Sequence, residues 1–280
     1  MKNKGFWSVI VLLFVCWLGN ILYFQSQLLK EPIILNAHIE IPAEEQALFS
    51  IYYLSNKHEV VEMQALTLEN YSISALHPFY TENPKDQSFH QEFTHHLIKE
   101  VSFDVTSEDI HQLNGSVEAK KLFAHFSNGQ VVPIKLDLLN FPTIAKSEDS
   151  SSSYSVEDGR SSSKFFFEKP VTMDPLELSP LTKNFMTVKA LTWKEDNQNK
   201  NNNPKLLDLS QPQHIKEGNV ASIELDSTGE IQERYIRSFQ LWQGINEAGN
   251  PVILYIPWRI EPHITQDMVN EWVKKARATE

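Results

Sequence analysis

Cysteine is nearly absent from this sequence: Cys16 is the single cysteine among 280 residues, and it lies in an apolar stretch near the N-terminus. The rest of the chain therefore has no cysteine for an internal disulfide or for a cysteine-ligated zinc site. Large extracellular regions without disulfides are more typical of bacterial surfaces than of animal cell surfaces. The cysteine content therefore predicts a bacterial protein.

Catalytic motifs are missing as well. The chain contains no G-x-S-x-G nucleophile elbow, no H-E-x-x-H metal motif and no glycine-rich phosphate loop. Paired acids such as Glu44 and Glu45 do not reveal the separation between carboxylates that glycoside hydrolysis requires. We therefore expect a protein that is not an enzyme and that needs no cofactor.

Basic charge is scarce outside the N-terminus. The net charge is −11, and residues 1–30 hold three lysines and no acid, so subtracting +3 leaves −14 for residues 31–280. A basic footprint for nucleic acid is absent, and an anionic membrane surface would repel this acidic body. We expect no nucleic-acid partner.

Charge is completely absent from residues 5–24, GFWSVIVLLFVCWLGNILYF. Twenty helical residues span ~30 Å, which is the hydrocarbon thickness of a bilayer. A cleaved signal peptide needs a small-x-small site, but Trp17 stands two residues before Gly19. A lipid-modified Cys16 would follow a small residue, but Val15 precedes it. The stretch is therefore predicted to remain as a single-pass signal-anchor helix in the cell membrane.

The flanking charges predict how this helix is oriented. Lys2 and Lys4 precede it, whereas Lys30 beyond it is balanced by Glu31. The positive-inside rule then places residues 1–4 in the cytoplasm and the body outside the cell. Within the helix, Asn20 either hydrogen-bonds another membrane helix or meets water near the outer interface.

The body reads as mainly β. Residues 33–41 alternate apolar and polar positions, short strands with turn residues follow, and Asn128-Gly129 is a strong hairpin signal. We predict two tandem β-sandwich (Ig-like) domains, over 31–142 and 165–280. The Ser-rich stretch 143–164 is predicted to be the linker between them, or alternatively a loop within one domain. Similar blocks at 102–107 and 222–227 leave a duplication of one domain open.

Two apolar faces are predicted for the strand over 251–260. Val252, Leu254, Ile256, Trp258 and Ile260 share one face, and Tyr255 lies on the other. The face with Tyr255 and nearby Phe239 is either a binding patch or is covered by a C-terminal amphipathic helix docked through Trp272; we favour the cover. Tyr255, Phe239 and Trp258 are the candidate ligand-binding residues.

Histidines gather in the first half of the chain, most densely in HQEFTHH at 90–96. Neutral imidazole is a good metal ligand, so His90, His95 and His96 are the candidate metal ligands. Their spacing fits neither one strand face nor one helix face, which favours solvated polar positions instead.

Together these features favour a membrane-anchored, extracytoplasmic, non-catalytic accessory or adaptor protein of a bacterial cell-envelope complex. Its expected partners are the lipid bilayer and another membrane or envelope protein. The alternative is a ligand-binding module for an envelope glycan or a metal ion.

Overall fold

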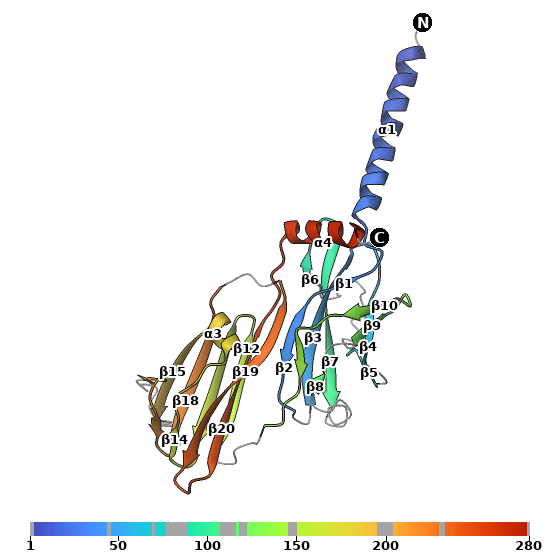
Figure 1. Cartoon of the computed structure of the whole chain (residues 1–280). Helices are drawn as coiled ribbons and strands as arrows, with labels where there is room; N and C mark the ends of the chain where they lie inside the picture. The colour runs from blue at the N-terminus through green and yellow to red at the C-terminus, as the bar shows by residue number, and fades with distance from the viewer. Residues whose placement is uncertain are drawn as a thin grey trace, which may run out of the picture.

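The computed structural model describes residues 3–43, 46–68, 71–76, 89–106, 116–117, 122–144, 150–194, 204–229 and 233–278. The chain is mainly β, with an apolar helix at its N-terminus and several sheets (Figure 1). In chain order its elements are α1 (Asn3–Gln27), β1 (Ile33–Ile34), β2 (Ala37–Glu40), β3 (Gln46–Asn56), β4 (Met63–Leu68), β5 (Tyr71–Ser74), β6 (Phe89–Glu92), β7 (His96–Thr106), β8 (Ser116–Val117), β9 (Leu122–Phe126), β10 (Val131–Ile134), β11 (Leu138–Asn140), β12 (Ser150–Glu157), β13 (Arg160–Phe167), β14 (Val171–Met173), α3 (Pro180–Phe185), β15 (Met186–Lys194), β16 (Lys205–Leu206), β17 (Gln213–Ile215), β18 (Asn219–Ser227), β19 (Tyr235–Asn246), β20 (Pro251–Ile260) and α4 (Gln266–Ala278).

Helix α1 projects from the body, as Figure 1 shows, and most of its side chains are exposed. Its segment Phe6–Gln27 has a mean hydropathy of 2.1 and is long and apolar enough to cross a membrane. A helix of this kind at an N-terminus acts either as a membrane anchor or as a signal sequence. The predicted apolar helix is therefore confirmed.

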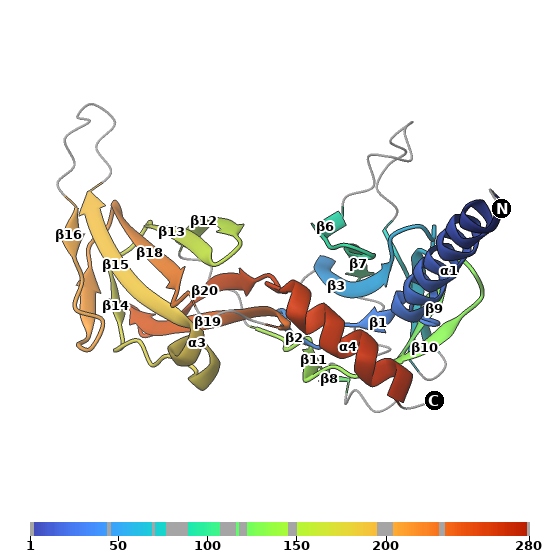
Figure 2. The ribbon, with the colours of Figure 1, turned by 90° about the horizontal axis from the view of Figure 1, so that it is seen from above.

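The body consists of two lobes, each with its own apolar core. The anchor-side lobe carries α1 and contains β1 to β11, the start of β19 and α4; its core includes Phe49, Phe103 and Phe141. The distal lobe contains β12 to β18, α3, most of β19 and β20; its core includes Phe167, Trp242 and Trp258. Figures 1 and 2 show the two lobes side by side.

Strand β19 passes through both lobes and joins them. Its first residues pair in parallel with β2, with Tyr235 opposite Ala37, and its last residues pair antiparallel with β14, with Asn246 opposite Val171. Strand β20 pairs with β19 along nearly its whole length. The resulting sheet, in the order β17-β14-β19-β2-β11-β8, is continuous between the lobes. Hydrogen-bonded backbone therefore connects the two cores.

The Ser-rich stretch is not a linker between the lobes. Strands β12 and β13 form a hairpin from it, with Glu157 opposite Arg160 and a two-residue turn of Asp158 and Gly159. Gly159 has a φ of +65°, which suits the turn types that tighten hairpins. Strand β13 also pairs with β18 and buries Ser161 and Ser163, so the serines lie within a sheet.

The C-terminal amphipathic helix exists but packs on the other lobe from the one predicted. Val269 and Val273 of α4 are buried in the anchor-side core, with Met268, Trp272 and Ala276 packed against it. In Figure 1, α4 lies across the end of this lobe, beside the base of α1. The prediction that α4 completes a domain over 165–280 and covers the face with Tyr255 is therefore wrong.

Two local predictions are confirmed. Asn128-Gly129 forms the turn between β9 and β10, and Gly129 has a φ of +84°. In β20 the five residues at even positions from Val252 to Ile260 are buried, whereas Tyr255 is partly exposed.

Candidate interaction sites

The junction between α1 and the anchor-side lobe is held by three polar side chains. Asn56, at the end of β3, accepts a hydrogen bond from the Leu29 backbone N–H and donates one to the Leu29 carbonyl, both at 2.8 Å. Its side chain is buried, with the residue 2% exposed. Asn56 therefore clamps the segment that follows α1 through both backbone groups of one residue.

His96 and Arg277 bind the carbonyl groups at the end of α1. The last carbonyls of a helix have no partner within the helix. His96 Nε2 donates to the Gln27 carbonyl at 2.9 Å, and Arg277 of α4 donates to the carbonyls of Gln25, at 3.1 Å, and of Ser26. Burial lowers the pKa of His96, which favours the neutral ring. Residues far apart in the chain thus cap α1.

Aromatic contacts extend the same junction. The ring of Phe24 lies 5.7 Å from that of His95 and 6.0 Å from that of His58, and Tyr23 lies 6.2 Å from His95. Because these contacts lie within the last turns of α1, the lobe begins directly at the end of the helix, without a spacer.

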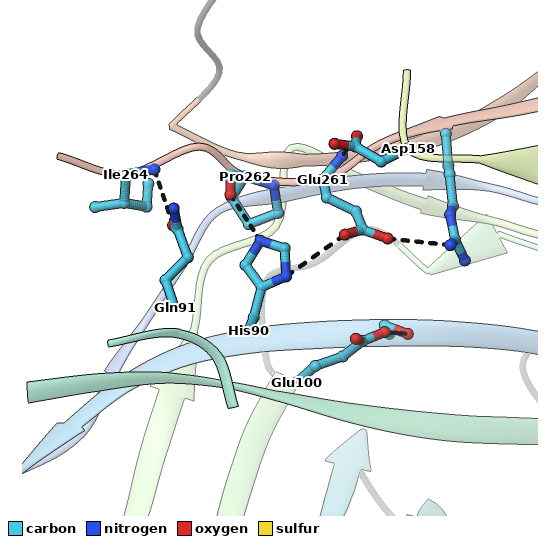
Figure 3. A network of polar contacts seen from close by, with 9 residues as sticks. His90, Gln91, Glu100, Asp158, Glu261, Pro262 and Ile264 are labelled. Carbon is cyan, nitrogen blue, oxygen red and sulfur yellow. Dashed lines mark hydrogen bonds and ion pairs between the residues drawn. The ribbon is translucent and has the colours of Figure 1, made fainter. Parts of the chain in front are cut away.

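A second polar network connects the lobes and is drawn in Figure 3. His90 of β6 donates from Nε2 to the Pro262 carbonyl at 3.0 Å, and its Nδ1 lies 3.4 Å from Glu261 Oε2. The other oxygen of Glu261 lies 3.1 Å from Arg259 Nη2. Burial raises the pKa of Glu261, while Arg259 and His90 favour its ionised form. The carboxylate of Glu261 therefore lies between the side chains of His90 and Arg259.

The same network fixes the segment that leads from β20 to α4. Glu261 donates its backbone N–H to Asp158 Oδ1 at 2.8 Å, and Ile264 donates its backbone N–H to Gln91 Oε1 at 3.0 Å. The ring of Tyr52 lies 5.2 Å from Tyr235, at the point where β19 enters the anchor-side lobe. These contacts fix the connecting segment to both lobes at once.

An open cleft lies beside the turn of the β12–β13 hairpin. Its volume is about 600 Å³, and four carboxylates line it, from Glu157, Asp158, Asp226 and Glu261. Arg160 Nε is paired with Asp226 at 3.0 Å, and His263 is the other basic side chain at the rim. The carboxylates outnumber the cations, so the cleft favours a positively charged ligand.

The predicted ligand-binding residues separate into two groups. Tyr255 and Phe239 lie together, with ring centroids 5.3 Å apart, and the exposed Tyr154 of β12 adds a third ring 6.3 Å from Tyr255. Trp258 is 0% exposed and belongs to the distal core. Trp258 is therefore wrong as a binding residue, whereas the other two form a surface aromatic cluster.

The predicted histidine ligands do not converge. His90 belongs to the interlobe network, His96 caps α1, and His95 contacts Tyr23 and Phe24. Among the described residues, no group of three or more His, Cys, Asp or Glu side chains is placed to hold a metal ion. Asn20 is on the exposed surface of α1. Sequence reasoning missed Asn56, Arg277 and Glu261, since single polar residues carry no pattern.

Comparisons with known proteins add little to this picture. No protein-family model matches the chain, and no curated protein matches it. A solved structure named BspA_C_mut aligns with 81% of this chain and 97% of its own, at 8% identity and a TM-score of 0.20. A likeness at this level carries no argument about fold or function.

Proposed function

We propose that this protein is a membrane-anchored adaptor that holds its distal lobe in a fixed position above a membrane for a protein partner. The observation that carries this proposal is the clamp on α1 by Asn56, His96 and Arg277. A flexible tether would need no such contacts. Membrane attachment also raises the effective concentration of a partner that shares the membrane.

Rigid connection between the lobes supports the same function. Strand β19 runs from Tyr235, packed on Tyr52, to its pairing with β14, so the distal lobe is joined to the anchored lobe through backbone hydrogen bonds. A contact made by the distal lobe would therefore be positioned relative to α1. That property suits an adaptor better than a mobile ligand receptor.

Several finer features belong to this proposal. We infer that α1 is an uncleaved single-pass anchor with residues 1–4 in the cytoplasm, that the body lies outside, and that the setting is a bacterial cell envelope. Each lobe is interpreted as a β-sandwich with Ig-like character, because each core lies among strands of more than one sheet. Asn20 is the proposed contact with a partner helix, since an exposed amide within a bilayer gains from a hydrogen bond.

The direct test is purification of the full-length protein from its own membranes in mild detergent, with mass spectrometry of the bound proteins and of the mature N-terminus. The proposal expects peptides covering residues 1–30 and one membrane protein in stoichiometric amount. The variant Asn20→Leu, which keeps α1 apolar, should retain less of that protein. Absence of any stoichiometric protein from the wild-type preparation would contradict the adaptor function.

The surface cluster of Tyr255, Phe239 and Tyr154 favours a second candidate function, the binding of an envelope glycan. Clustered rings at the surface offer apolar faces to a flat ligand. Retention of the full-length protein on insoluble cell wall, reduced by Tyr255→Ala and unchanged by Gln243→Ala, would support this function. Equal retention of both variants would exclude the cluster as the binding surface.

A further inference from the structure

Among the described strands, β12 is a long sheet edge that pairs with β13 alone. It spans eight residues, SSSSYSVE, and forms one end of the five-stranded sheet β12-β13-β18-β15-β16. It contains neither proline nor lysine, which are the residues that natural edge strands use against pairing with other chains. By contrast, the edge strand β10 contains Pro133, and β20 contains Pro251 and Pro257.

The register of the hairpin identifies the backbone groups at the open edge. Glu157 and Arg160 flank the two-residue turn, so they exchange hydrogen bonds, and such pairs alternate along an antiparallel ladder. Residues 151, 153, 155 and 157 therefore direct their backbone groups toward β13. Ser152, Tyr154 and Val156 direct theirs away from β13, and within the part of the chain that the structure describes no strand pairs with this side of β12, so its donors and acceptors can pair with a further strand.

The surroundings of this edge indicate the chemistry of the strand that would add to it. Tyr154 is 60% exposed and lies against Tyr255, so an added strand would meet an aromatic surface on one face. At the turn end of the edge, Glu157 and Asp158 enter the acidic cleft. A basic side chain at the corresponding end of the added strand would complement these carboxylates.

We propose that β12 binds an extended, basic segment of a partner protein, which adds to the sheet as a sixth strand and places a lysine or arginine at the acidic cleft. Main-chain hydrogen bonds to the open edge supply affinity, and the carboxylates supply specificity. The inference rests on the proposed adaptor function and names the surface and the kind of segment that it uses.

The test uses the full-length protein in detergent and two fluorescent peptides of alternating valine and threonine, one with lysine and one with glutamate at both ends. Binding is measured by fluorescence anisotropy at low ionic strength. The lysine peptide should bind at least about tenfold more tightly than the glutamate peptide, because the edge ends in an acidic cleft. Equal affinities would overturn the proposal.

Variants of Ser152 distinguish the contribution of its backbone N–H to peptide binding from that of its side chain. Ser152→Pro removes one donor from the open edge without touching the pairing with β13, and should weaken the lysine peptide about tenfold. Ser152→Ala keeps the donor and should stay within about twofold. If proline perturbs the hairpin, Glu157→Lys provides an independent readout, since reversal of an exposed charge should weaken the same peptide about tenfold. Unchanged binding by both Ser152→Pro and Glu157→Lys would overturn the proposal.

Co-purification from membranes distinguishes this inference from the function on which it rests. If the wild type retains a stoichiometric partner and Ser152→Pro retains it equally, the edge is not the docking surface, although the adaptor function stands. If the wild type retains no partner, the adaptor function fails, whatever the peptides show.

Discussion

Replacement of Asn56 by alanine should release the anchor helix from the body. The amide of Asn56 makes two hydrogen bonds of 2.8 Å to the backbone of Leu29. Both Asn56 and Leu29 are buried, at 2% and 6% exposure. Alanine at position 56 removes both partners and leaves one N–H and one carbonyl unpaired.

The expected magnitude follows from the cost of leaving buried polar groups without partners. Each costs about 1–3 kcal/mol, so the pair would cost about 2–6 kcal/mol if residues around Leu29 stayed in place. If the segment around Leu29 detaches from the lobe, water can bind its N–H and carbonyl groups. The cost of the substitution then cannot exceed the free energy by which this segment packs against the lobe. The variant should therefore lose the junction, while the core of the lobe melts nearly as before.

A distance measurement can detect this release. Cys16 lies exposed on α1 and is the only cysteine, so one spin label there and a second on Lys135→Cys report the distance between helix and lobe. In lipid nanodiscs the parent protein should give a narrow distance distribution. Asn56→Ala should give a broad one, and Asn56→Asp, which keeps the acceptor, an intermediate one.

The control is Asn270→Ala, which changes an exposed amide on α4 and should leave the distribution narrow. An equally narrow distribution in Asn56→Ala would refute the reasoning, because it would mean that the remaining contacts fix α1 without Asn56. The fixed junction on which the adaptor proposal rests would then depend on His96 and Arg277 and not on Asn56.

Four other predictions test the fold. Gly244→Ala should destabilise the distal lobe by about 1–3 kcal/mol or more in urea titrations, since the added Cβ would lie 2.7 Å from Met173 Cα. Trp258→Ala should cost about 3–5 kcal/mol and Tyr255→Ala only ~1 kcal/mol, because the first is in the core and the second at the surface. Burial lowers the pKa of His96 from 6.5, so the unfolded chain binds more protons below that pH. The free energy of unfolding of the wild type should therefore fall more than that of His96→Gln between about pH 7.5 and 5.5. Equal losses in the two proteins would contradict a lowered pKa of His96 in the folded state. Val273→Asp places a charge in the anchor-side core, and should abolish hydrogen-exchange protection in β7 while β18 keeps more of its protection.

The elements that could be predicted from the sequence are those marked by a pattern of neighbouring residues. Apolar alternation identified β20 and its buried face, the charge-free run identified α1, and Asn128-Gly129 identified a hairpin. The same kind of signal is present at Asp158-Gly159, but the linker prediction rested on the serine content of the stretch alone. Serine on a strand is tolerated where neighbouring strands satisfy its backbone, as β18 does for β13.

Nonlocal pairing could not be predicted in the same way. Residues 37–39 pair with residues 235–237, and no periodicity marks two segments so far apart as partners. The amphipathic face of α4 predicted that the helix packs on something, but not on which lobe. The junction between α1 and the anchor-side lobe could not be predicted for the same reason. Asn56, His96 and Arg277 are far apart in the sequence and meet only in the folded lobe.

The path of β19 also has a consequence for biosynthesis. A growing chain completes β1 to β11 early, but the core that these strands surround stays open until Tyr235, Val269 and Val273 arrive. The distal core likewise waits for β19 and β20. The distal core is complete only once Ile260 has been made and the anchor-side core only once Val273 has been made, so both cores wait for almost the whole chain. A premature stop after β18 would leave two unfinished lobes and extensive apolar surface for chaperones or proteases to recognise.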